Sequence, residues 1–149
     1  MKKRIDLSIV IVSYNTKKFL ETCLRTVYES VNTTTVSGEV IVVDNASTDG
    51  SWEMVEKQYP SVRLIRNDTN RGFGTGNNQG IAEAHGDVIL LLNSDIEVLD
   101  GAIEKLYQFF LTRPEKTIVS GKLFYPDRTP QTSCGPSYTL TNIFIALLL

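Results

Sequence analysis

Apolar runs alternate with amphipathic stretches along most of the chain. Residues 7–12 form a mostly apolar, β-branched run, and residues 19–31 then carry apolar side chains at three- to four-residue spacing. The first pattern predicts a buried strand and the second an amphipathic helix. The same two patterns recur further along the chain. They predict strands at residues 39–43, 62–65, 87–92 and 118–122, and helices at residues 52–59, 81–84 and 100–113.

This alternation of strands and helices predicts an α/β fold with a Rossmann-like, mostly parallel sheet, because right-handed crossovers place helices on both faces of such a sheet. Apolar runs without polar alternation are typical of strands that are covered on both sides. The regular alternation ends at residues 127–137, where prolines and glycines predict turns.

The composition excludes some classes of binding partner. A chain of 149 residues with 42% hydrophobic residues fits one globular domain. Its 15 basic and 17 acidic residues lack the basic excess that nucleic-acid binding needs, so we expect no nucleic-acid partner. The apolar residues 143–149 are far fewer than the roughly twenty needed to cross a bilayer, so we expect no transmembrane segment in this chain.

Neither cysteine belongs to a metal-binding motif or to a disulfide framework. This cysteine usage fits a reducing cytoplasm. Cys23 falls on the apolar stripe of the first predicted helix, so we expect it to be a small core residue; Cys134 lies in the turn-rich stretch.

Polar residues gather directly after four predicted strands, at residues 13–15, 44–45, 67–76 and 93–95. The carboxyl ends of parallel strands share one edge of the sheet, and ligands bind there. Such residues also cap helices and form turns, and we expect Thr16, Ser51 and Asp100 to do so. Each cluster alone fits either explanation, whereas four on one edge favour a single ligand site.

Two common nucleotide-binding motifs are missing. A dinucleotide fingerprint should follow the first strand, yet residues 13–16 contain no glycine. The glycines at residues 72–76 come after the third strand, and Asn77 stands where the last glycine should be. The chain also lacks the P-loop motif, so dinucleotide binding and P-loop chemistry are disfavoured.

Four segments, residues 7–15, 42–51, 70–80 and 91–95, resemble the ordered motifs of family 2 glycosyltransferases. The resemblance extends from residue 7 to about residue 125. It implies the type A glycosyltransferase fold, which binds a nucleoside-diphosphate sugar and a divalent metal. Asn93-Ser94-Asp95 matches the Asp-x-Asp motif of this family, with Asn in place of the first Asp.

The resemblance also implies an activity. We expect an inverting, metal-assisted transfer of a hexose or rhamnose from a UDP- or dTDP-linked sugar to a glycan or lipid-linked acceptor. The enzyme would act in cell-wall or polysaccharide biosynthesis, in the cytoplasm or, as a peripheral protein, at the inner face of the membrane. The alternative is a non-catalytic nucleotide-binding or interaction module with the same fold.

The resemblance assigns roles to individual residues. Asp44 accepts a hydrogen bond from the pyrimidine base, which suits an acceptor-only carboxylate. Arg71 approaches the base or the diphosphate. Asp95 is the ligand of Mg²⁺ or Mn²⁺, ions that often use only one or two protein carboxylates. The substrate-binding residues implied in this way are Ser13, Tyr14, Asn15, Asp44, Asn45, Ser47, Arg71, Gly74, Asn93, Ser94 and Asp95.

No carboxylate after Asp95 matches an acceptor-site motif, and in the family the general base comes from the second half of the domain. We therefore expect residues 1–149 to be the nucleotide-sugar-binding part of one glycosyltransferase domain. The acceptor half, with the general base, is expected to follow residue 149.

Overall fold

The computed structural model describes residues 4–115 and 117–132, so Cys134 and residues 143–149 lie outside the described residues. The chain forms two compact units, Met1–Thr112 and Arg113–Leu149.

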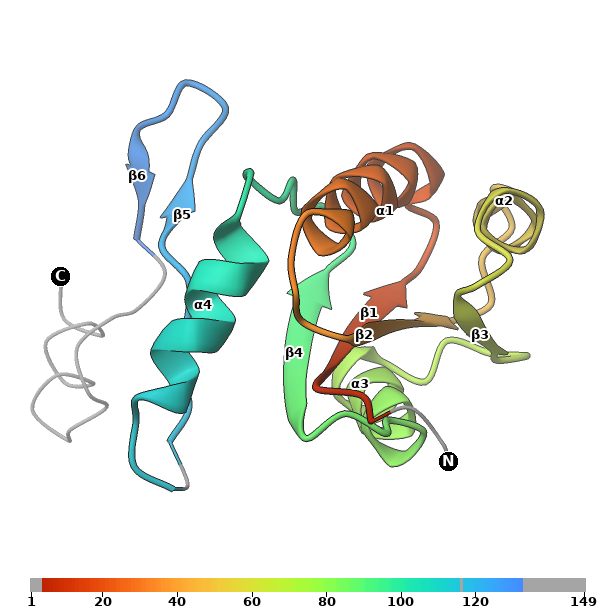
Figure 1. Cartoon of the computed structure of the whole chain (residues 1–149). Helices are drawn as coiled ribbons and strands as arrows, with labels where there is room; N and C mark the ends of the chain where they lie inside the picture. The colour runs from red at the N-terminus through yellow and green to blue at the C-terminus, as the bar shows by residue number, and fades with distance from the viewer. Residues whose placement is uncertain (1–3, 116, 133–149) are drawn as a thin grey trace, which may run out of the picture. The chain divides into compact units, whose positions relative to one another are not determined.

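The first unit is built around a sheet in which every pair of neighbouring strands is parallel, with the order β3-β2-β1-β4. In Figure 1, α1 and α2 lie on one side of this sheet and α3 on the other. The predicted α/β fold with helices on both faces is therefore confirmed. The strands are β1 (Leu7–Ser13), β2 (Gly38–Asp44), β3 (Arg63–Arg66) and β4 (Val88–Asn93), and the helices are α1 (Lys17–Asn32), α2 (Ser51–Gln58), α3 (Phe73–Ala82) and α4 (Ala102–Leu111).

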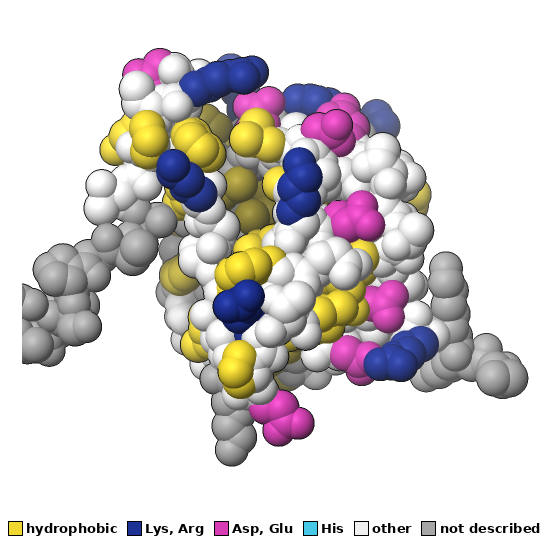
Figure 2. All heavy atoms as spheres, turned by 60° about the vertical axis from the view of Figure 1, so that its left-hand side comes forward, with side chains coloured by type: hydrophobic (Ala, Val, Ile, Leu, Met, Phe, Trp, Pro, Cys, Tyr) yellow, Lys and Arg dark blue, Asp and Glu magenta, His cyan; other side chains and the backbone are white. Residues whose placement is uncertain are grey.

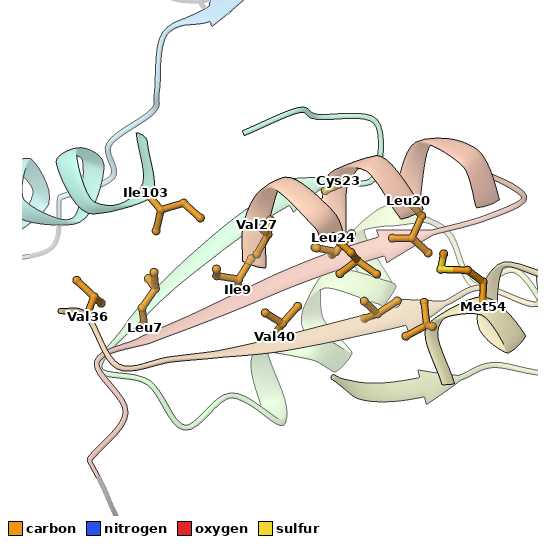
Figure 3. Close-up of a cluster of buried hydrophobic side chains, with 13 residues drawn as sticks. Leu7, Ile9, Leu20, Cys23, Leu24, Val27, Val36, Val40, Met54 and Ile103 are labelled. Atoms are coloured by element: carbon orange, nitrogen blue, oxygen red, sulfur yellow. The ribbon is translucent and has the colours of Figure 1, made fainter. Parts of the chain in front are cut away.

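The main core lies between the sheet and α1. Every residue of β1 is buried, and Ile9 belongs to the same buried cluster as Leu24 and Val27 of α1 (Figure 3). Burying side chains of this size contributes about 1.5–3 kcal/mol each. Cys23 lies in this cluster, as its place on the apolar stripe predicted.

The opposite face of β1 is covered by α3, which lies close to the strand because of two glycines. A Cβ atom at Gly80 would come within 2.3 Å of Val10 Cγ1, and one at Gly76 within 2.9 Å of Val12 Cγ1. This close approach explains a helix with three glycines, although each glycine disfavours a helix by about 1 kcal/mol. The helix begins at Phe73, well before the predicted start near residue 81.

Two expectations about the sheet were wrong. Residues 118–122 do not form a strand; in the second unit, β5 (Leu123–Phe124) and β6 (Pro130–Gln131) instead pair as an antiparallel hairpin. Strand β4 is covered on one face only, since Ile89 and Leu91 are 39% and 48% exposed. Figure 2 shows hydrophobic side chains at the surface among Lys and Arg on the face that it draws.

We predict that Gly80→Ala destabilises the first unit by about 1–3 kcal/mol, because the new methyl group overlaps Val10. Gly74→Ala is the matched control in the same helix, since a Cβ atom there meets nothing within 4 Å. Urea unfolding measures both free energies. Equal stability of the two variants would contradict the close α3–β1 packing.

Candidate functional site

A cavity opens at the carboxyl ends of β1 and β4. Strand β1 pairs with β2 on one side and with β4 on the other, so the strand order reverses direction here. Such a switch point is where open α/β sheets bind ligands. The cavity has a volume of about 580 Å³ and is lined by Val12, Thr16, Phe19, Phe73, Asn93, Ser94 and Asp95.

Hydroxyl groups connect the carboxyl ends of β1 and β4 beside this cavity. The hydroxyl groups of Ser13 and Thr16 share a hydrogen bond of 2.9 Å, and Thr16 Oγ1 donates to Ser94 Oγ at 3.1 Å. Thr16 is the N-cap residue of α1, as expected, but its hydroxyl makes no capping hydrogen bond. Thr16 instead ties the loop after β1 to the motif after β4.

One carboxylate, that of Asp49, serves the first residues of both α1 and α2. Asp49 Oδ2 accepts the N–H of Lys17 at 2.8 Å, and Oδ1 accepts the N–H and the hydroxyl of Ser51. Burial raises the pKa of this carboxyl, but these hydrogen bonds lower it further, so the net pKa lies below its usual range.

Ser51 and Asp100 do not cap helices. Ser51 is the first residue of α2, whereas Asp100 lies in the turn before α4, whose N-cap is Gly101. Asp49 belongs to the polar stretch after β2, but the spacing of residues alone did not show which carboxylate there would accept a hydrogen bond from the start of α1.

The loops after β1 and β2 are joined by hydrogen bonds. The Asn15 N–H donates to Ser47 Oγ at 2.9 Å, and the Thr48 N–H donates to Asn15 Oδ1 at 2.8 Å. Asn15 has a φ of 53°, a left-handed conformation that Asn tolerates better than most residues. Tyr14, the residue before Asn15, is exposed at this edge of the sheet.

Asp44, the last residue of β2, carries an acceptor without a partner. The residue is only 2% exposed. Its Oδ1 accepts the Ser47 N–H at 2.9 Å, whereas its Oδ2 is buried and has no hydrogen-bond partner among the described residues. A buried carboxylate oxygen without a donor is unfavourable. Asp44 is therefore suited to receive a hydrogen bond from a ligand.

A chain of amides holds the turn that starts α3. Asn45 Nδ2 donates to Gly72 O at 3.3 Å, and Asn67 Nδ2 donates to Asn45 Oδ1 at 2.9 Å. Asn67 and Gln79 exchange two further hydrogen bonds of 2.8 and 2.9 Å. Gly72 has a φ of 81°, which favours glycine.

Sequence reasoning missed Gln79. Its position in the sequence indicated a contact with the sheet edge. Gln79 lies three residues after Gly76 and one before Gly80, so it is beside the face of α3 that packs on the sheet.

The expected site residues all lie at the carboxyl edge of the sheet or in the loops that follow it, but only some share the cavity. Asn93, Ser94 and Asp95 line it. Ser13, Asp44, Asn45 and Ser47 are buried at the neighbouring strand ends, and Tyr14, Asn15, Arg71 and Gly74 are exposed. Four lining residues were not predicted: Val12, Thr16, Phe19 and Phe73.

The oxygen-rich end of the cavity suits a hard cation. Within the described residues, no group of three His, Cys, Asp or Glu side chains could hold a metal ion. Mg²⁺ needs only one or two protein carboxylates when a phosphate supplies further oxygens. Asp95, with the side-chain oxygens of Asn93 and Ser94 beside it, fits that type of site.

A buried thiol lies behind this motif. Burial, with a smaller contribution from the charge of Asp95, raises the pKa of Cys23 to about 12. Its Sγ lies 3.6 Å from the carbonyl oxygen of Asn93. Cys23 therefore supports the loop after β4 and is not a nucleophile.

An open parallel sheet with a cavity at its switch point, lined by both apolar and polar side chains, is typical of nucleotide-binding α/β proteins. Within that class, a sequence profile described as glycosyl transferase family 2 matches residues 8–134. The chain belongs to this family.

Curated relatives are similar over most of this chain but are much longer. "Glycosyltransferase GlyG" of Streptococcus pneumoniae is 34% identical over 109 residues, which are 68% of this chain and 34% of the relative. "Succinoglycan biosynthesis protein ExoO" of Rhizobium meliloti is 34% identical over 104 residues, or 69% of this chain and 29% of the relative. The chain thus spans about a third of the length of these relatives.

Solved structures share the fold. The mannosyltransferase PcManGT of Pyrobaculum calidifontis, in complex with GDP-Man and Mn²⁺, has a TM-score of 0.66 at 24% identity, covering 76% of this chain and 34% of that one. TarS 1-349 of S. aureus, in complex with UDP-GlcNAc, has a TM-score of 0.63 at 25% identity, covering 72% of this chain and 31% of that one. In the described part of this chain, no helix has the length and apolar character needed to cross a membrane.

We predict that Asp49→Ala lowers the free energy of unfolding by about 1–2 kcal/mol at pH 7, because both helices lose a capping acceptor. The folded pKa of Asp49 is lowered, so its contribution is present above the unfolded pKa of about 3.9 and is lost as the pH falls through the folded pKa. The difference from wild type should therefore shrink in acid. Urea unfolding at several pH values measures it, with exposed Asp68→Ala as control; a difference that grows in acid would contradict the assignment.

We predict that Cys23 resists thiol reagents in the folded protein at neutral pH, because a thiol with a pKa of about 12 is protonated and this one is buried. Alkylation followed by mass spectrometry tests this in a Cys134→Ser variant, whose only thiol is Cys23. Labelling should require denaturant. Native labelling as fast as that of a free cysteine would contradict the buried position.

Proposed function

We propose that this chain is the donor-binding part of an inverting glycosyltransferase that takes a sugar from a UDP- or dTDP-linked donor. The observation that carries the proposal is the cavity at the switch point, where Asp95 stands at the ends of β1 and β4. Family membership gives the general class of reaction. The choice of a UDP- or dTDP-linked donor rests on two parts of the site, one for the base and one for the diphosphate.

The base end is assigned to Asp44. Uracil and thymine each offer one ring N–H, and a carboxylate is an acceptor only. The unpartnered Oδ2 of Asp44 supplies such an acceptor, and Tyr14, Asn15 and Ser47 extend the base and ribose side. A solved structure of similar fold, TarS, binds UDP-GlcNAc, which supports a uridine nucleotide here.

The diphosphate end is assigned to the cavity. Its lining includes Thr16 and Phe19 at the start of α1 and Phe73 at the start of α3. Helix N-termini carry partial positive charge and favour phosphate groups. Arg71, exposed just before α3, adds a full positive charge, and Gly74 leaves room for the ligand.

Asp95, with Asn93 and Ser94, is assigned to Mg²⁺ or Mn²⁺. When bound, the ion would neutralise the charge of the departing diphosphate. Asn at position 93 leaves Asp95 as the one carboxylate of this motif. The metal affinity of the free chain should therefore be low and rise when a nucleoside diphosphate adds its oxygens.

The acceptor side is assigned to a longer protein. Inversion by direct displacement needs a general base for the acceptor hydroxyl, and no carboxylate after Asp95 matches such a site. Since the chain spans about a third of its relatives, we propose that residues 1–149 form the donor-binding part of one domain whose acceptor half follows residue 149. A cytoplasmic enzyme of glycan assembly, with a glycan or lipid-linked acceptor at the membrane's inner face, fits this arrangement.

Titration calorimetry with UDP, with and without Mn²⁺, tests the donor site. We predict that Mn²⁺ raises the affinity for UDP about tenfold or more, which corresponds to roughly 1.4 kcal/mol, and that Asp95→Ala removes this increase. The matched control is Glu97→Ala, two residues away, because that exposed carboxylate pairs only at 3.8 Å with Arg25.

Metal-independent binding by the wild-type chain, or an undiminished metal effect in Asp95→Ala, would overturn the assignment. Sugar transfer is tested in the longer protein with candidate acceptors. Binding of the donor without transfer there would support the alternative, a non-catalytic module.

A further inference from the structure

Arg66, the last residue of β3, lies over the only tryptophan of the chain. Its guanidinium carbon is 3.3 Å from the centroid of the Trp52 ring, at the start of α2. Within the described residues, no carboxylate lies within 4.0 Å of the Arg66 guanidinium. A guanidinium that stacks by its flat face keeps its N–H groups free, since these point outward in the plane of the group.

This stacked arginine is the neighbour of Asp44 in the sheet. Arg66 and Asp44 are register partners in the parallel β2–β3 pairing, so their side chains leave the sheet on the same face. Asp44 Oδ2 is buried and has no hydrogen-bond partner among the described residues. An unpartnered carboxylate oxygen and a positively charged group with unpaired N–H donors therefore belong to neighbouring residues at the two strand ends.

We propose that Arg66, held on Trp52, is a second base-reading residue and selects uracil or thymine over cytosine together with Asp44. This inference rests on the proposed nucleotide site. It assigns Arg66 to the base and leaves Arg71, at the start of α3, to the diphosphate.

The chemistry of the bases supports this division. Uracil and thymine carry a ring N–H between two carbonyl oxygens, so their edge reads acceptor, donor, acceptor. Asp44 accepts from the central N–H and Arg66 donates to one adjacent oxygen. Cytosine has a bare ring nitrogen at the central position and an amino group in place of one oxygen. In the same pose, cytosine would offer no donor to Asp44, and its amino group would face the positively charged Arg66. Both effects disfavour cytosine.

Trp52 is a positioning residue in this arrangement. It is half-buried and belongs to the first turn of α2, whereas Arg66 is exposed and would sample many rotamers without the ring. Stacking on an aromatic face pre-orients the planar guanidinium, so less freedom is lost when its hydrogen bonds form.

Calorimetric titrations with UDP and with CDP, on the same protein preparations, test the proposal. Wild type should bind UDP about tenfold or more tightly than CDP, as expected when a site built for polar pairing meets a mismatched partner. Arg66→Met keeps an unbranched stem but removes the donors, and should weaken UDP binding while changing CDP binding little. Trp52→Leu should reduce the UDP-to-CDP ratio by a smaller factor.

The matched control is Arg63→Met, the same change on the same strand. Arg63 pairs with Glu83 at 3.0 Å at the opposite end of β3, so its loss should leave the UDP-to-CDP ratio unchanged. Thermal melts of all variants confirm that the site is compared in folded proteins.

The possible failures are distinguishable. A wild-type chain that binds UDP more tightly than CDP and an Arg66→Met variant that keeps this ratio would overturn the role of Arg66 and leave the proposed function intact. Equal wild-type affinity for both nucleotides would overturn base reading by Asp44 and Arg66. A wild-type chain that binds no nucleoside diphosphate would overturn both proposals.

Discussion

The central position of β1 is the constraint on which the rest of this structure depends. The strand is buried along its whole length and pairs in parallel with β2 on one side and β4 on the other. Chain connectivity then places the loops after β1 and β4 next to each other, with helix N-termini above and below. The cavity follows from this topology, because helices leave the two sheet faces in opposite directions at the switch point.

The loops at this edge are held by the chain's own polar groups. Asp49 connects the starts of α1 and α2, the Thr16 hydroxyl connects the ends of β1 and β4, and a chain of amides fixes the turn before α3. Asp44 Oδ2 stands apart from these satisfied groups because it has no donor among the described residues. This unpartnered carboxylate oxygen is the observation on which the proposed base site rests.

Much of the first unit could be predicted from periodicity, since apolar runs and amphipathic stretches report directly on burial. The start of α3 could not, because three glycines in ten residues look like a loop until the close approach of Gly80 to Val10 and of Gly76 to Val12 is known. The missing strand at residues 118–122 has a related cause. A short stretch that begins with Ile118 and Val119 gives a strand only where a neighbouring strand supplies hydrogen bonds, and propensity does not identify that neighbour.

The site was predicted in part for the same reason. Asp44 ends one strand and Asp95 follows another, and both match family motifs, so the sequence was enough to place them at this edge of the sheet. Phe19 and Thr16 sit in a helical pattern that also fits core packing or capping, and only the fold places them around the cavity. Arg66 belongs to no motif, and its proposed role depends on one contact and one pairing that only the fold shows: the contact with Trp52 and the register with Asp44.

A crystal structure of the chain grown with UDP and Mn²⁺ tests the central claim most directly, which is that one nucleotide spans the edge from β2 to β4. The account predicts anomalous scattering from Mn²⁺ within coordination distance of a carboxylate oxygen of Asp95. It also predicts the uracil N–H within hydrogen-bond distance of Asp44 Oδ2. Nucleotide density elsewhere on the chain, or a manganese ion bound away from Asp95, would contradict it.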